Sequence, residues 1–145
     1  MNRRIAVRAV IIQDGKLFCA KLKHLGGGVN DFWCTIGGGL DEQESLLDGL
    51  MREVIEETGI TPVIGKLLYV QQYRDDVQEH MEFFYEVTNA KDFMNIDLSK
   101  SSHGAAEIDA YSFVDPTAVS VLPKFLQTES YNDISAQPTR FFSYL

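Results

Sequence analysis

Residues 38–60, GGLDEQESLLDGLMREVIEETGI, carry the clearest structural signal in this 145-residue chain. Apolar residues recur there at spacings of three and four, which predicts a helix with one apolar face. Residues typical of helix ends stand on both sides of the apolar pattern. They are Ser45 with Asp48, Asp41 with Glu44, and Gly59. We therefore expect a helix that begins after the capping pairs and ends at the glycine.

Three glutamates crowd the second half of this helix. At about 100° per residue, Glu53 and Glu57 lie on one face, and Glu56 flanks Glu53 on its other side. Like charges at these spacings destabilise a helix by roughly 0.2–0.5 kcal/mol per pair. A solvated acidic face would explain Glu56 and Glu57 taken alone. A bound divalent cation explains all three, and an all-oxygen ligand set favours Mg²⁺ or Mn²⁺.

The whole stretch resembles the Nudix box. That signature is Gly, any five residues, Glu, any seven, then Arg-Glu-aliphatic-any-Glu-Glu-any-Gly-aliphatic. All nine of its fixed positions are filled, by Gly38, Glu44, Arg52, Glu53, Val54, Glu56, Glu57, Gly59 and Ile60. The resemblance implies an α/β fold, the α/β/α sandwich with a mixed β-sheet. The box helix would lie on one side and a C-terminal helix on the other.

The same resemblance assigns roles to residues of the box. Three glutamates are similar to the metal-binding carboxylates of the family, a backbone carbonyl at Gly37 or Gly38 resembles a further ligand, and two residues resemble those that orient the cluster through ion pairs. The glutamates are Glu53, Glu56 and Glu57, and the orienting residues are Arg52 and Glu44. One departure is Ile36, which stands where many members have proline, and isoleucine cannot fix φ as proline does.

Hydrolysis of a pyrophosphate requires a carboxylate that takes a proton from water. Glu53 is the first candidate, because the box supplies it, and Glu107 is the second, because some members of the family place a catalytic or metal-binding glutamate in that region. An ordinary surface role for Glu107 stays open. Arg8 interrupts an apolar run, which indicates a substrate-binding or ion-pair role unless it lies at an edge facing solvent.

Composition limits the classes of function. The formal net charge is −8, which argues against bulk nucleic-acid binding. Two cysteines are too few for a disulfide framework, and we expect two reduced thiols in a cytoplasmic protein. No apolar run approaches the length of a membrane span.

The rest of the chain predicts strands with one further helix. Strands are expected at 5–13, 16–24, 32–36, 66–73, 79–88 and 110–114, and a helix from Pro116 to about Thr128. Asp14-Gly15 predicts a hairpin turn. We expect one domain over residues 1–145, with the resemblance covering about 3–128. The aromatic tail, residues 129–145, would pack on the body or on a second subunit, which is consistent with a homodimer.

The resemblance implies an enzyme, a Nudix pyrophosphohydrolase that acts on a nucleoside diphosphate linked to another moiety. The substrate would be a nucleoside triphosphate, ADP-ribose or a nucleotide sugar. The alternative is a non-catalytic nucleotide-sensing or binding module on the same fold. Such modules typically lose the carboxylates of the box, and this chain retains them.

Overall fold

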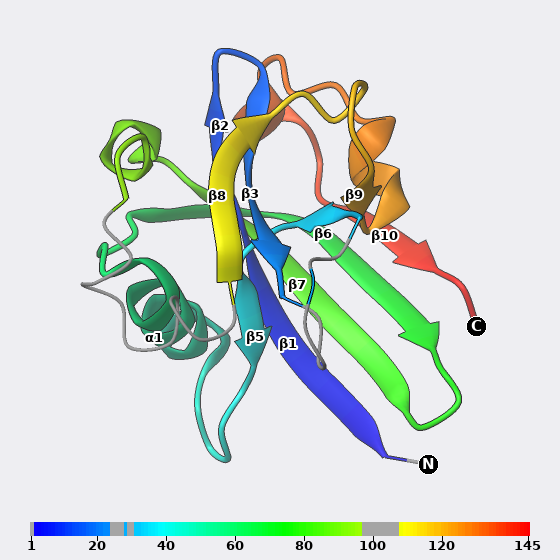
Figure 1. Ribbon diagram of the computed structural model, residues 1–145. Helices are drawn as coiled ribbons and strands as arrows, with labels where there is room; N and C mark the ends of the chain where they lie inside the picture. The colour runs from blue at the N-terminus through cyan, green and yellow to red at the C-terminus, as the bar shows by residue number, and fades with distance from the viewer. Residues whose placement is uncertain (1, 24–27, 29–30, 97–107) are drawn as a thin grey trace.

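The computed structural model describes residues 2–23, 28, 31–96 and 108–145. Within these residues, two mixed β-sheets pack together, and one α-helix covers a face of the first (Figure 1). The predicted α/β class with a mixed sheet is confirmed. Glu107 lies outside the described residues. None of the helices in the described part of the chain is long and apolar enough to span a membrane.

The first sheet has the strand order β10-β6-β7-β1-β5. Its strands are β1 (Arg3–Val10), β5 (Gly37–Gly39), β6 (Ile64–Arg74), β7 (Glu79–Val87) and β10 (Arg140–Ser143). Strand β7 pairs antiparallel with β6 and parallel with β1, and β1 pairs antiparallel with β5. Strand β5 consists of three glycines and forms one edge of the sheet. This edge is where the box begins.

The second sheet is built around β3 (Lys16–Leu22). Strand β3 pairs with β2 (Ile12–Gln13), β4 (Trp33–Cys34) and β8 (Ile108–Val114), and β4 pairs in parallel with β9 (Val121–Leu122). The predicted turn at Asp14 and Gly15 is confirmed, because both residues have positive φ, 53° and 76°. This turn joins β2 to β3, as the two-residue hairpins with this backbone do.

The predicted box helix is α1 (Leu46–Thr58). Its start is fixed by Ser45, whose hydroxyl accepts a hydrogen bond from the backbone N–H of Asp48 at 3.1 Å. Its end is fixed by Gly59, which is left-handed at φ 75°. Leu50 and Val54 are fully buried against the sheet, in a cluster with Val7 and Ala9 of β1. The local capping signals and the apolar stripe therefore placed this helix correctly.

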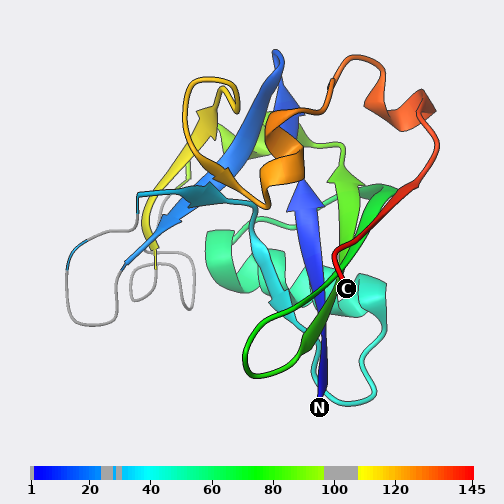
Figure 2. The same cartoon turned by 90° about the vertical axis from the view of Figure 1, so that its right-hand side faces the viewer.

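A second apolar cluster lies on the opposite side of the first sheet. Residues of β1 alternate between the faces, so Val10 belongs to a cluster with Phe84, Tyr69 and Leu126 rather than to the cluster that includes the helix. The C-terminal segments cover this side, and Figure 2 shows the last strand running back beside β6. The third layer of the sandwich therefore consists of short 3-10 helices, η3 (Lys124–Gln127) and η4 (Ile134–Ala136), with the strand β10.

Two expectations about secondary structure are wrong. The helix expected over 116–128 is replaced by β9 and the single-turn helix η3, because Val121 and Leu122 pair with β4 and Pro123 interrupts any continuous helix. The strand expected over 5–13 divides at Ile11, where the chain leaves the first sheet and enters the second. The aromatic tail packs on the body, through Tyr131 and Phe142.

Candidate metal and substrate site

The glycines of β5 allow the box helix to approach the sheet closely. Gly37 has φ 142°, and a β-carbon there would overlap the carbonyl oxygen of Val7 and lie 2.9 Å from the Cα of Arg8. A β-carbon at Gly38 would lie 2.7 Å from both carboxylate oxygens of Glu53. The Glu53 carboxylate therefore rests directly on the backbone of β5. Only glycine permits this contact at residue 38 without displacing the glutamate.

Arg52 holds the glutamates of the box in one arrangement. Its guanidinium binds Glu44 through two hydrogen bonds, from Nε at 2.8 Å and from Nη2 at 2.9 Å. Nη2 also donates to the carbonyl oxygen of Gly39 at 3.1 Å. Nη1 donates to Glu53 at 3.0 Å and to Glu56 at 3.1 Å. Arg52 thus links two of the predicted metal ligands to the loop that precedes the helix.

The ion pair with Arg52 changes the acidity of Glu44. Hydrogen bonds from Arg52 and from the backbone N–H of Asp41 lower the pKa of Glu44 from 4.5 to about 2. Arg52 in turn has its pKa raised, chiefly by the hydrogen bond to Glu44. Because the folded pKa of Glu44 is depressed, its contribution to stability is present above about pH 4.5 and is lost as the pH falls toward 2.

We expect Glu44→Gln to flatten the acid side of the stability profile. The free energy of unfolding of the native protein should exceed that of the variant at neutral pH, and this difference should shrink from about pH 5 to about pH 3 as the unfolded carboxyl becomes protonated. Urea unfolding of both proteins across that range measures the effect. Glu42→Gln, at an exposed site in the same loop, is the control. A difference that is independent of pH would contradict the ion-pair assignment.

Glu57 contacts the glycine strand β5. Its Oε2 accepts a hydrogen bond from the backbone N–H of Gly37 at 3.0 Å. The carbonyl of the same glycine accepts a hydrogen bond from Nη1 of Arg8 at 3.3 Å. Gly37 therefore connects the helix carboxylates on one side of β5 with the Arg8 side chain on the other.

The box carboxylates fit a hard divalent cation by their chemistry. In the described residues, no three His, Cys, Asp or Glu side chains converge on one point, and the glutamates of the box bind Arg52 and the backbone N–H of Gly37. The donors nevertheless are carboxylates and glycine carbonyls, which are the ligands of Mg²⁺. The lack of a side chain at Gly38 lets the Glu53 carboxylate lie against the backbone of β5. The predicted ligands are Glu53, Glu56, Glu57 and the Gly38 carbonyl, and they remain predictions.

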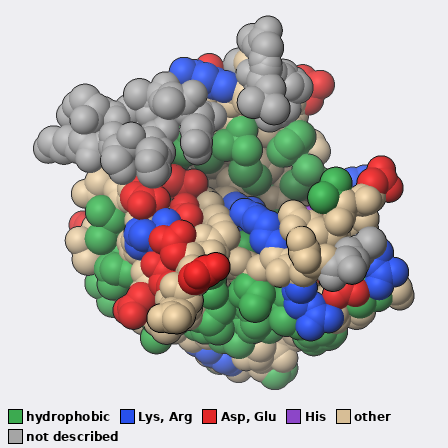
Figure 3. All heavy atoms as spheres, turned by 90° about the horizontal axis from the view of Figure 1, so that it is seen from below, with side chains coloured by type: hydrophobic (Ala, Val, Ile, Leu, Met, Phe, Trp, Pro, Cys, Tyr) green, Lys and Arg blue, Asp and Glu red, His purple; other side chains and the backbone are tan. Residues whose placement is uncertain are grey.

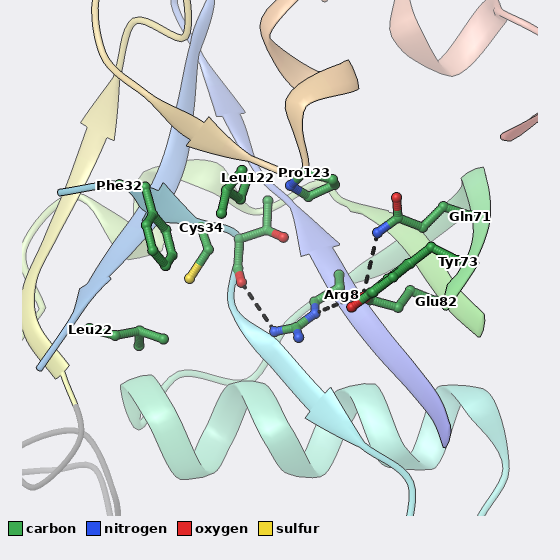
Figure 4. A pocket seen from close by; sticks show the side chains of 10 residues that line it. Arg8, Leu22, Phe32, Cys34, Gln71, Tyr73, Glu82, Leu122 and Pro123 are labelled. Carbon is green, nitrogen blue, oxygen red and sulfur yellow. Dashed lines mark hydrogen bonds and ion pairs between the residues drawn. The ribbon is translucent and has the colours of Figure 1, made fainter. Parts of the chain in front are cut away.

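A pocket of about 440 Å³ opens between the two sheets, on the face of β1 away from the helix. Figure 4 shows its apolar side, with Phe32, Leu22 and Leu122, facing a polar side with Gln71 and Tyr73. In Figure 3, acidic side chains gather beside a hollow in which a basic side chain lies. The carboxylates of the box and a ligand-sized cavity thus stand next to each other, separated by β5.

Arg8 lies in this pocket but is already paired. Its Nε donates to Glu82 at 2.9 Å, and Glu82 also accepts hydrogen bonds from Tyr73 at 3.1 Å and from Gln71 at 3.4 Å. Burial raises the pKa of the Glu82 carboxyl, but the charge and hydrogen bond of Arg8 outweigh it, and the net shift is downward. Of the two roles that the sequence allowed, the ion pair is present. A substrate-binding role for Arg8 remains a prediction.

Gln71 and Tyr73 belong to the site but were not predicted from the sequence. Both belong to β6, lie two residues apart on one face of the strand, and face Glu82 on β7, where Gln71 is its register partner. Three polar residues on one face of a hairpin are a detectable signal. The partner of that face, β1, could not be inferred from local sequence, because 74 residues separate Arg8 from Glu82.

Comparison with known proteins identifies a family that matches most of this chain. The family described as the NUDIX domain matches residues 2–135. A comparison with curated protein sequences finds no match. Among solved structures, the ORF135 protein of E. coli is 19% identical with a TM-score of 0.69, and 94% of this chain aligns with 93% of that one.

Two further solved structures are similar over most of this chain. The MutT protein of Methanosarcina mazei Go1 is 24% identical with a TM-score of 0.68, and 87% of this chain aligns with 88% of that one. A UDP-X diphosphatase is 17% identical with a TM-score of 0.68, over 97% of this chain and 68% of the other. At these identities the structures show a shared fold.

Proposed function

Because this chain belongs to the NUDIX domain family, we propose that it hydrolyses, with Mg²⁺ or Mn²⁺, a pyrophosphate bond in a nucleoside diphosphate linked to another moiety. The match over residues 2–135 confirms the resemblance carried by residues 38–60. With it, the class of enzyme is a Nudix pyrophosphohydrolase. Beyond this class of enzyme, we propose the metal, the substrate and the roles of single residues.

One observation carries the proposal. Glu53, Glu56 and Glu57 lie along one side of the glycine strand β5, and the pocket of about 440 Å³ lies on the other side. Cavities of this size bind small ligands, and a mixed apolar and polar lining suits a nucleoside. A substrate with its nucleoside between the sheets would thus bring its phosphates to the box.

Each residue of the box has a task in the proposed reaction. A cation held there would neutralise phosphate charge and lower the pKa of bound water. Glu53 would take the proton of the attacking water, as a new P–O bond forms and the bridging P–O bond breaks. Arg52 keeps Glu53 and Glu56 in place, and Gly37 does the same for Glu57. Glu107 is the alternative base.

The candidate substrates are nucleoside triphosphates, ADP-ribose and nucleotide sugars. All three contain a pyrophosphate attached to a nucleoside. The pyrophosphate would lie at the carboxylates of the box, and the nucleoside would lie in the adjoining pocket. One of the structurally similar proteins is named UDP-X diphosphatase, and this name describes a substrate in which a nucleoside diphosphate is linked to another moiety. The protein carries a formal charge of −8, so the attraction of any of these anions depends on local cations.

Turnover of a substrate panel tests the proposal. We expect Mg²⁺-dependent release of phosphate products from at least one nucleotide or nucleotide sugar, and its loss in Glu57→Gln with the thermal unfolding temperature retained. Glu42→Gln, which removes an equal charge from an exposed site, should behave as the native protein. Wild-type turnover in Glu57→Gln with Mg²⁺ present would refute the metal assignment. Tight nucleotide binding without turnover of any panel member would favour the sensing module.

A further inference from the structure

Arg4 differs from the other arginines of the chain in its partners. Each of the other five forms an ion pair with a carboxylate. The pairs are Arg3–Glu79, Arg8–Glu82, Arg52–Glu44, Arg74–Glu79 and Arg140–Glu129. Arg4 makes neither an ion pair nor a hydrogen bond with its side chain to any residue that the structure describes, although it is half-buried. A half-buried guanidinium without a counter-ion is uncommon and calls for an explanation.

The position of Arg4 places its charge beside the box. Residues 4, 6 and 8 of β1 share one face, and Ala6 is the register partner of Gly39 in β5. A β-carbon built on Gly39 would lie 3.3 Å from both Nε and Nη2 of Arg4. The guanidinium therefore lies across the glycine strand. The carbonyl of that same Gly39 binds Arg52, the residue that orients the carboxylates.

The carboxylate of Glu82 is already bound by other residues and is therefore not a partner for Arg4. Glu82 accepts hydrogen bonds from Arg8, Tyr73 and Gln71. The charge of Arg4 helps to lower the pKa of Glu82, but only through space. Arg8 is neutralised and fixed between Glu82 and the carbonyl of Gly37. On this face of β1, Arg4 is thus the guanidinium whose donors all remain for a ligand, among the residues described, whereas Arg8 keeps only those of Nη2.

We propose that Arg4 binds a phosphate oxyanion of the nucleotide substrate. This assignment rests on the proposed function, because it takes the phosphate chain to lie along β5. A guanidinium presents two parallel N–H donors to a phosphate, which gives both strength and orientation. In an acidic protein with an acidic box, such a cation offsets the repulsion that the substrate would otherwise meet.

Equilibrium binding tests the assignment without turnover. The probes are inorganic pyrophosphate and α,β-methylene-ADP, titrated by calorimetry in the presence of Mg²⁺. Arg4→Gln should bind both probes about 10- to 100-fold more weakly than the native protein, because a charge-assisted contact is lost. Arg3→Gln is the matched control: it removes the same charge from the adjacent residue, whose side chain is 53% exposed. We expect its affinity to stay within about twofold of the native value.

The outcomes separate this assignment from the proposed function. Equal affinities for the native protein and Arg4→Gln would overturn the role of Arg4, even if the panel showed turnover. Arg4-dependent binding without turnover would support Arg4 while the hydrolase proposal failed. No binding of either probe to the native protein would also overturn the role. If Arg4→Gln does not fold, Arg4→Lys replaces it. A loss of affinity in Arg4→Lys no larger than that in Arg3→Lys would refute the bidentate contact.

Discussion

Glu53→Gln is expected to lower kcat by about 10²- to 10⁴-fold while the protein stays folded. The Glu53 side chain is 16% exposed, rests on Gly38 and accepts a hydrogen bond from Arg52 at 3.0 Å. Glutamine has the same shape, and its carbonyl oxygen can keep the contact with Arg52. It cannot accept a proton from water at neutral pH. Steady-state kinetics on the best panel substrate, at saturating Mg²⁺, measure the loss, and thermal unfolding confirms the fold.

Two further variants show whether the loss of kcat in Glu53→Gln comes from the loss of the general base. Glu42→Gln provides the baseline, because Glu42 is exposed and lies in the loop before the helix. Glu107→Gln tests the other candidate base. If Glu53→Gln loses less than about tenfold and Glu107→Gln loses more, the role of general base belongs to Glu107. Titration of kcat against Mg²⁺ concentration in Glu53→Gln separates a weakened metal site from a missing base.

The helix and its ends were predictable because their causes are local. Ser45 caps the first turn with its own hydroxyl, and Gly59 ends the last turn with its own left-handed backbone. Leu50 and Val54 lie on one stripe whatever they pack against. The Asp14-Gly15 turn was predictable for the same reason, since both residues supply the positive φ that a tight hairpin requires.

The parts that sequence did not predict depend on contacts between distant segments. Local propensity favoured a helix after Pro116, but pairing with β4 made Val121 and Leu122 of that segment a short strand. Propensity is a weak constraint when a partner strand is available. Likewise, Arg8 was recognisable as unusual, but its partner Glu82 comes from a strand 74 residues away. The resemblance named the box carboxylates and gave no information on the polar face opposite them.

Gly37→Ala is expected to destabilise the protein by about 3 kcal/mol or more, the range of severe core substitutions. Gly37 has φ 142°, a conformation that residues with a β-carbon rarely adopt. The added carbon would also overlap the carbonyl oxygen of Val7, a fully buried residue of the neighbouring strand β1. A backbone atom held in a sheet cannot yield as a side chain does. Urea unfolding, followed by far-ultraviolet circular dichroism, measures the change in free energy.

Gly15→Ala separates the two causes of that loss. Gly15 also has positive φ, at 76°, but a β-carbon there would meet nothing within 4 Å. Its alanine variant should therefore lose only the conformational term, about 1 kcal/mol. Similar losses at the two sites would show that β5 can move away from β1, and the tight approach would then not be needed. A much larger loss at Gly37 would show that the glycine strand is rigid, which is the condition for its N–H to hold Glu57 in place.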